Sequence, residues 1–202
     1  MARNFTRYNS LIFATIFLTS TSSAKVTTGI DDQAQLPYWE LNKGTLSLRI
    51  VQRLPDQTRA YFSGRGFNKA DSDFIASHCF FQTVFRNTST TSKPHKLKYD
   101  LRQWQIIYHN KKHSLMLRED WQNIWDHRNA KSAQKIAFEW SLLPTKQEYL
   151  PADYNWGMST YPLPHGTKFN LDIIWYIDGK NNQATITDIQ CAKDIELSPV
   201  EE

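Results

Sequence analysis

The fold is decided in the last third of the chain, where residues 169–192 read FNLDIIWYIDGKNNQATITDIQCA. Apolar side chains occupy every second position from Phe169 to Ile177, and polar side chains fill several of the positions between them. An alternation of period two is typical of a strand that lays one face on an apolar core. The stretch therefore predicts a long strand with one face buried.

The same stretch also contains the partner of this strand. Residues 178–182, Asp-Gly-Lys-Asn-Asn, have the composition of a tight hairpin turn. The chain then returns from Ala184 to Ala192 with alternating apolar residues. The spacing slips by one between Ile186 and Ile189, which predicts a bulge in the returning strand.

Working outward, other segments repeat the period of a strand and a few have the period of a helix. The strand-like segments are 46–51, 80–88, 104–108, 115–117 and 136–142, and the helix-like segments are 55–63, 68–78 and 119–128. Strands and helices do not alternate as they do in parallel α/β proteins. The sequence therefore predicts a mainly β protein, α+β by content, folded as an antiparallel immunoglobulin-like β-sandwich with two or three short helices inserted.

The beginning of the chain has the pattern of an export signal. Arg3 and Arg7 precede the apolar run Leu11 to Leu18, and Ser22-Ser23-Ala24 follows as a small-residue cleavage pattern. The run is much shorter than the roughly 20 residues that a membrane-spanning helix needs. We expect a cleaved signal peptide at 1–24, a flexible lead-in at 25–37, one sandwich domain at 38–196 and a disordered tail at 197–202.

Charge excludes one class of partner. Removal of residues 1–24 takes away two of the 24 basic residues and none of the 20 acidic residues, which leaves a net charge of only +2. A protein that binds nucleic acid usually has clustered lysines and arginines. The sequence predicts no nucleic-acid partner, and no membrane span remains after signal cleavage.

The cysteines agree with export. The chain has two of them, Cys79 and Cys191. An even number in an oxidising compartment predicts a disulfide. We therefore expect a periplasmic or secreted protein.

A candidate binding segment lies just before the hairpin. Residues 149–166 are expected to form a long loop that carries Tyr154, Trp156, Met158 and Tyr161. Loops of this length are often functional, and exposed rings suit a docking surface. The alternative is that the same rings cover one end of the sandwich.

Histidines supply the second candidate site. His109 and His113 flank a predicted turn, and His127 and His165 lie elsewhere in the chain. Imidazole groups suit zinc or copper, although the spacing fits no known metal motif. A periplasmic copper or zinc handler is therefore kept as an alternative to a protein without a cofactor.

Catalytic chemistry has the weakest support. Asp126 beside His127, or Asp153 in the aromatic loop, could serve as an acid or base, but no nucleophile motif accompanies them. A hydrolase is the third alternative. The leading interpretation is an exported, non-enzymatic binding or assembly-accessory domain whose partner is another exported or envelope protein.

Overall fold

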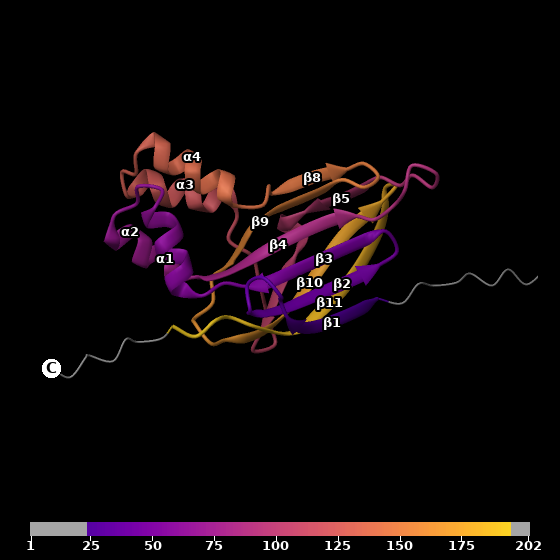
Figure 1. Cartoon of the computed structure of the whole chain (residues 1–202), viewed down its shortest axis with the longest axis horizontal. Helices are drawn as coiled ribbons and strands as arrows, with labels where there is room; N and C mark the ends of the chain where they lie inside the picture. The colour runs from indigo at the N-terminus through magenta and orange to yellow at the C-terminus, as the bar shows by residue number, and fades with distance from the viewer. Residues whose placement is uncertain (1–23, 195–202) are drawn as a thin grey trace, which may run out of the picture.

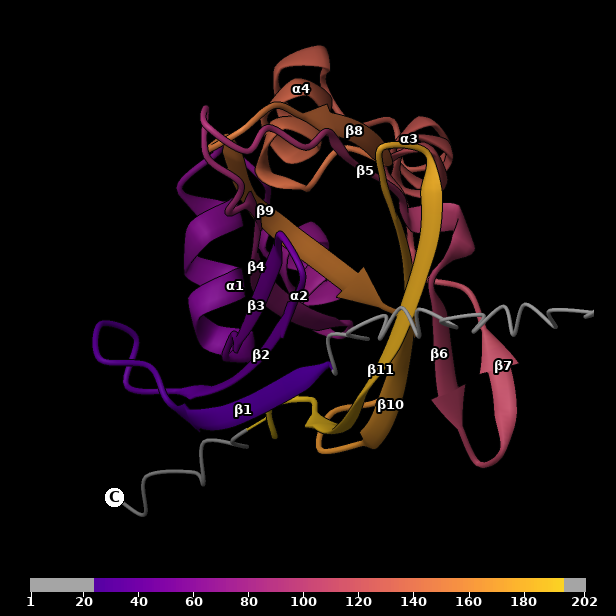
Figure 2. The ribbon, with the colours of Figure 1, turned by 90° about the vertical axis from the view of Figure 1, so that its right-hand side faces the viewer.

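The computed structural model describes residues 24–194. These residues form two antiparallel sheets that face each other (Figures 1 and 2). The expected signal peptide, except Ala24, and the expected tail at 197–202 lie outside the described residues. Mainly antiparallel β structure in two sheets confirms the predicted fold class. A β-sandwich-like architecture is consistent with this arrangement.

The first sheet has five strands in the order β1-β2-β3-β4-β9. Its strands are β1 (Lys25–Ile30), β2 (Pro37–Lys43), β3 (Leu46–Gln52), β4 (Cys79–Asn87) and β9 (Tyr154–Tyr161). The first four form a meander, in which each strand pairs with the next along the chain. The fifth, β9, comes from much later in the sequence and pairs with β4 along its whole length.

The second sheet has six strands and is built around the long hairpin predicted from residues 169–192. Its strands are β5 (Leu97–Asp100), β6 (Gln105–Tyr108), β7 (Lys111–His113), β8 (Lys146–Tyr149), β10 (Lys168–Ile177) and β11 (Lys180–Gln190). A short 3-10 helix, Leu101–Gln103, separates β5 from β6, and both of these strands pair with β10.

The hairpin of β10 and β11 confirms the prediction, including its irregularity. The register between the strands shifts between Phe169 and Leu171, which lie opposite Ile189 and Ile186. Asp188, between these two isoleucines, has a positive φ of 57°. The slip in apolar spacing therefore marks a bulge, as expected.

Four helices gather at one end of the sandwich (Figure 1). They are α1 (Pro55–Ser63), α2 (Lys69–Ala76), α3 (Arg118–His127) and α4 (Ser132–Ser141), and we call them the helical layer. Three of them match predicted helices. At the start of α2 the side chain of Asn68 accepts a hydrogen bond from the backbone N–H of Asp71 at 2.8 Å and so caps the helix.

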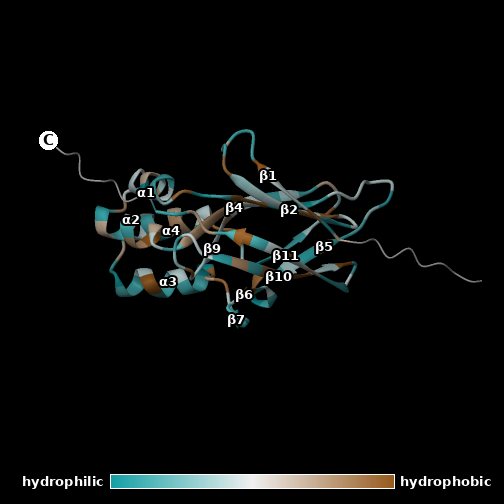
Figure 3. Cartoon of the chain, turned by 90° about the horizontal axis from the view of Figure 1, so that it is seen from below, coloured by the Kyte–Doolittle hydropathy of each residue, from teal (hydrophilic) through white to brown (hydrophobic). Residues whose placement is uncertain are grey.

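Two apolar cores hold these layers together. One lies between the two sheets and includes Phe81, Tyr161 and Trp175. The other lies between the helical layer and the first sheet and includes Phe80 and Trp121. In Figure 3 the helices of the helical layer carry both hydrophobic and hydrophilic residues, as helices that bury one face do. Because Phe80 and Phe81 are neighbours on β4 and point to opposite faces, this strand is covered on both faces at this end.

The predicted disulfide is present. Cys79, the first residue of β4, is bonded to Cys191, which follows β11, and their Cα atoms are 5.4 Å apart. The bond joins the first sheet to the end of the second. A disulfide is consistent with an oxidising compartment.

The predicted strand at 136–142 is wrong, because this segment is helical up to Ser141. Ile136, Phe138 and Trp140 alternate in sequence, but only Phe138 is buried among these three. Ile136 and Trp140 lie one helical turn apart and are exposed. The alternation that resembles a strand therefore combines one core residue with two surface residues.

Two expected loops contain strands. Residues 25–30 form the edge strand β1 where a flexible lead-in is expected, and residues 154–161 form β9 inside the expected long loop. All six residues of β1 are at least partly exposed, so the strand has no buried face to produce an apolar alternation. The predicted hairpin near residue 110 is present, although its second strand is Lys111–His113 and not 115–117.

The immunoglobulin-like topology is not confirmed. In an immunoglobulin constant domain strands A, B, E and D form one sheet and C, F and G the other, so no four consecutive strands share a sheet. Here β1 to β4 follow one another in a single sheet.

Within residues 24–194 no helix has the length and apolar character needed to cross a membrane.

Candidate functional site

The outer face of the first sheet, which points away from the second sheet, is covered by the helical layer at one end only. On β4 the side chains of Phe80, Gln82, Val84 and Arg86 point to this face, because Phe81 between them points to the core between the sheets. Phe80 lies under the helices. From Gln82 onward the face is less covered, and Arg86 is exposed.

Two aromatic side chains stand on the open part of this face. Tyr154 is 58% exposed and Trp156 is 63% exposed, and both belong to β9. Trp156 lies opposite Val84 in the strand register, and Tyr154 lies opposite Arg86. The guanidinium of Arg86 lies 4.9 Å from the centre of the Tyr154 ring. Large exposed aromatics beside an apolar residue are typical of a docking surface.

A groove of about 540 Å³ adjoins these rings. Its floor includes Gln82 and Val84, and its walls come from the β1–β2 loop and from Arg53 and Gln57 at the start of α1. Because Val84 also lies opposite Trp156, the groove and the exposed aromatics form one continuous surface. We call this the outer-face site.

The wall formed by the β1–β2 loop is held in place by charge. Arg49 donates to Asp31 at 2.8 Å and to Glu40 at 3.1 Å. The Asp31 carboxylate also accepts the backbone N–H of Ala34 at 2.9 Å. This backbone bond, together with Arg49, keeps the pKa of Asp31 below its ordinary value. The loop therefore forms a fixed border in which the Asp31 carboxylate is paired with Arg49.

The other two residues of the predicted aromatic site lie elsewhere. Met158 is buried under the helical layer, and Tyr161 is buried between the sheets. Tyr154 and Trp156 are exposed, as a docking surface requires. Met158 and Tyr161 fill the cores, as the alternative of covering side chains requires. Met158 shares the outer face with Tyr154 and Trp156 but lies at the end that the helices cover. Tyr161 points to the other face of β9, into the core between the sheets.

The predicted histidine residues do not form a cluster. Within the described residues no group of three or more His, Cys, Asp or Glu side chains could hold a metal ion. His127 Nδ1 lies 2.7 Å from the carbonyl of Asn123, and His165 Nε2 lies 2.7 Å from the carbonyl of Ala76. Since a carbonyl only accepts, these nitrogens donate, and only the other nitrogen of each ring keeps a lone pair.

His109 and His113 lie at the β6–β7 hairpin. His109 is in the turn, where it has a positive φ of 48° and stacks on Tyr108 with ring centres 3.9 Å apart. His113 is exposed at the end of β7. The two residues belong to a surface hairpin at the edge of the second sheet.

The acidic residues proposed for catalysis have structural partners. Asp126 pairs with Lys135, which joins α3 to α4. Asp153 accepts the backbone N–H of Leu150 at 2.9 Å in the turn before β9. Both carboxylates are accounted for by contacts that hold local structure.

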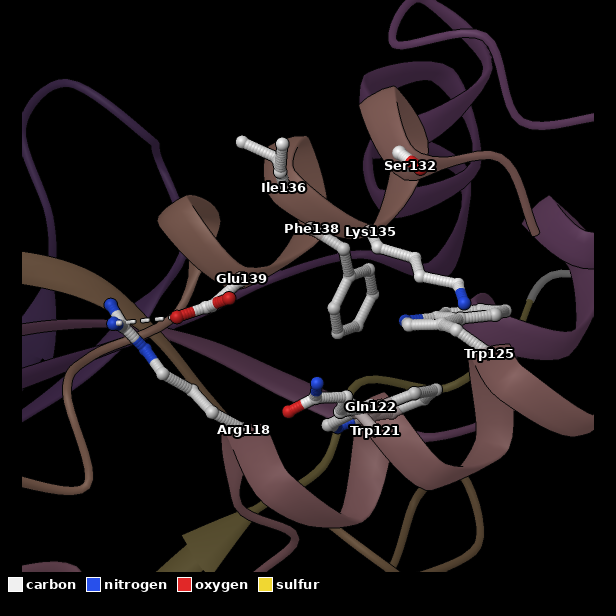
Figure 4. Close-up of a pocket in the computed structure, with 9 residues that line it drawn as sticks. All are labelled: Arg118, Trp121, Gln122, Trp125, Ser132, Lys135, Ile136, Phe138 and Glu139. Atoms are coloured by element: carbon white, nitrogen blue, oxygen red, sulfur yellow. Dashed lines mark ion pairs between the residues drawn. The ribbon is translucent and has the colours of Figure 1, made fainter.

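A second, smaller cavity of about 200 Å³ lies between α3 and α4 (Figure 4). Its floor is formed by Trp121, Trp125 and Phe138, and Arg118 and Glu139 form an ion pair of 3.8 Å at its border. The three rings pack against one another at centroid distances of 4.7 to 5.5 Å as part of the core under the helices. The floor therefore serves packing, and we assign the cavity no ligand.

Sequence reasoning missed Arg53, Arg86 and Val84. In sequence they are single residues on strands or at a strand end, and nothing distinguishes them from other basic or β-branched residues. Their importance comes from β9, which places Trp156 and Tyr154 beside β4. Because β4 and β9 are far apart in the chain, their pairing leaves no signal in the sequence of either strand.

No family model matches this chain, and no curated protein matches it.

Proposed function

We propose that this is an exported, periplasmic or secreted, non-enzymatic domain that binds another exported or envelope protein through the outer-face site. The observation that carries the proposal is the exposure of Trp156 and Tyr154 next to the groove. A partner that covers Trp156 removes its exposed ring from water. Burial of such rings is a major source of binding energy at protein interfaces.

The rigid support of these rings favours binding. Tyr154 and Trp156 lie on a strand that is paired with β4 along its length, so the backbone that carries both rings is fixed before a partner arrives. A preorganised surface loses little conformational entropy on binding. An assembly-accessory role needs such a surface and needs no catalytic group.

Export is supported by two features. The Cys79–Cys191 disulfide is consistent with an oxidising compartment. The sequence of residues 1–24 has the pattern of a cleaved signal.

The test is photocrosslinking in cells that naturally make the protein. The photoreactive amino acid p-benzoylphenylalanine replaces Tyr154 or Trp156 in two separate variants. The matched control replaces Lys112, which is exposed on β7 of the second sheet. We expect the same crosslinked protein from positions 154 and 156 and not from position 112, with its identity read by mass spectrometry.

A second variant checks that the contact is specific. Trp156→Ala in the protein with the photocrosslinker at position 154 should reduce the yield of the product several-fold. Absence of a product at both positions, or the same products at position 112, would count against the proposal.

A further inference from the structure

Three arginines of the described residues form no ion pair with a carboxylate, and each of them lies over a tyrosine ring. Arg53 and Arg65 lie over Tyr61, at 5.2 and 3.2 Å from the ring centre. Arg86 lies over Tyr154 on the outer face. The other arginines of residues 24–194 have carboxylate partners, namely Arg49, Arg59, Arg102, Arg118 and Arg128. Two of these three arginines, Arg53 and Arg86, therefore lie at the outer-face site without a carboxylate partner among the described residues.

Among these three, Arg53 lines the groove. Its Nε atom is buried and has no hydrogen-bond partner among the described residues. One terminal nitrogen makes a long contact of 3.4 Å to the carbonyl of Gln57. Burial lowers the pKa of Arg53, and the nearby charge of Arg65 lowers it further. A partly buried cation of this kind is costly when it has no anionic partner.

The rest of the groove does not supply that partner. The carboxylate in its lining is Asp31, which is bonded to Arg49 and to the backbone of its own loop. Near Arg53 the lining includes the neutral residues Gln57 and Gln82. Amides solvate an anion, but they do not neutralise the guanidinium.

We propose that the groove binds a carboxylate side chain of the partner protein and that Arg53 is its anchor. The proposal rests on the proposed function and names the chemistry of the partner. A guanidinium presents paired N–H donors whose geometry matches a carboxylate. An apolar residue next to the acidic residue packs on Val84 and Trp156, which continue the same surface. The recognised segment of the partner therefore has an acidic residue next to an apolar residue.

The experiment is a selection followed by a binding measurement. A random 12-residue peptide library displayed on phage is selected on the disulfide-bonded protein with p-benzoylphenylalanine at position 156. Only peptides that crosslink to this position are kept and sequenced. We expect Asp or Glu beside an apolar residue to be enriched in the selected peptides.

The strongest peptide is then measured by isothermal titration calorimetry against a set of variants. Arg53→Met keeps most of the length of the side chain and removes its charge. It should weaken binding by about 10- to 100-fold, because loss of a charge-assisted hydrogen bond costs several RT. Arg65→Met, which removes a charge over the same Tyr61 ring but outside the groove, is the matched control and should change affinity less than about 3-fold.

A change in the peptide tests the same contact without altering the protein. Replacement of the selected Asp or Glu by Asn or Gln should weaken binding to the natural protein by the same factor as Arg53→Met. The two changes together should weaken binding hardly more than either alone, because they remove the same interaction.

Two results would overturn the proposal: selected peptides without enrichment in acidic residues, or equal binding by the natural protein and Arg53→Met. The proposed function is judged separately. If the cellular crosslinks at Tyr154 and Trp156 are obtained while Arg53→Met has no effect, the docking surface stands and the carboxylate anchor does not.

Discussion

Cys79 and Cys191 are bonded across 112 positions of sequence, and the bond joins the first residue of β4 to the residue that follows β11. The bond therefore connects the first sheet to the segment that leaves the second sheet. Both cysteines are buried in the core between the sheets. The bond fixes the relative position of the two layers at one end of the sandwich.

Removal of this bond should lower the free energy of unfolding substantially. In the chain-entropy description, a loop of about 100 residues is worth about 4 to 5 kcal/mol. The double variant Cys79→Ala/Cys191→Ala should lose an amount of this order in urea unfolding followed by tryptophan fluorescence. A reducing agent should destabilise the natural protein and leave the double variant unchanged. Equal urea midpoints for natural and double-variant protein would contradict the expectation.

Gly157 should tolerate no larger side chain. A Cβ atom at this position would lie 2.6 Å from the backbone nitrogen of Leu143 and 2.8 Å from the carbonyl carbon of Leu142. Gly157→Ala would push the segment after α4 away from β9 and should cost about 1 to 3 kcal/mol, as overpacking does. Gly64→Ala is the control, because its nearest contact is 3.4 Å and its φ is −64°. Thermal unfolding of both variants measures the difference.

Asn87 should be one of the most sensitive polar residues. Its buried side-chain amide donates to the carbonyls of His95 at 2.7 Å, Leu150 at 3.0 Å and Tyr149 at 3.2 Å. Asn87→Ala leaves these carbonyls without that donor and should cost about 2 to 3 kcal/mol. The neighbouring Thr88→Ala removes one exposed hydrogen bond and should cost well under half as much. Comparable losses in the two variants would show that the amide contributes little.

The exposed and the buried aromatics should differ in their effect on stability. Trp156→Ala should change the free energy of unfolding by about 0.5 kcal/mol or less, because most of this side chain is in water. Phe138→Ala should cost about 3 to 5 kcal/mol, because its ring packs on Phe62, Trp121 and Trp125 under the helices. Urea unfolding gives both values. A large loss for Trp156→Ala would indicate that this tryptophan is a structural residue.

Acid should weaken the contact between Asp194 and Arg59. The hydrogen bond from Arg59, at 2.6 Å, keeps the pKa of Asp194 below its ordinary value. A folded pKa below the unfolded value stabilises the protein above the unfolded pKa, and this stabilisation is lost as the pH falls through the folded pKa. Asp194→Asn should therefore be less stable than the natural protein at pH 7, and the difference should shrink below pH about 4. A difference that is constant with pH would rule out this origin.

The sequence predicts the elements whose burial is regular along the chain. On β10 the side chains of Phe169, Leu171, Ile173 and Trp175 are buried at every second position, so the apolar pattern and the structure coincide. The disulfide is equally predictable from the sequence, because the chain has two cysteines and each has only the other as a partner.

The apolar pattern misleads where apolar residues lie on the surface. Ile136 and Trp140 are exposed, so the apolar spacing of α4 does not describe its buried face. The sequence predicts Tyr154, Trp156, Met158 and Tyr161 together as a binding surface, because nothing in it separates the exposed residues from the buried ones. The helical layer covers β9 from Met158, and the second sheet covers Tyr161 on the other face. Both covers come from residues far away in sequence.

The helical layer is assembled from two separate stretches of chain. Residues 55–76 provide α1 and α2, residues 118–141 provide α3 and α4, and Phe62 stacks on Phe138 with ring centres 4.8 Å apart. Neither pair of helices can shield its aromatic side chains from water alone. The layer should therefore gain and lose its amide protection in hydrogen exchange as one cooperative unit, coupled to the docking of β9 on β4.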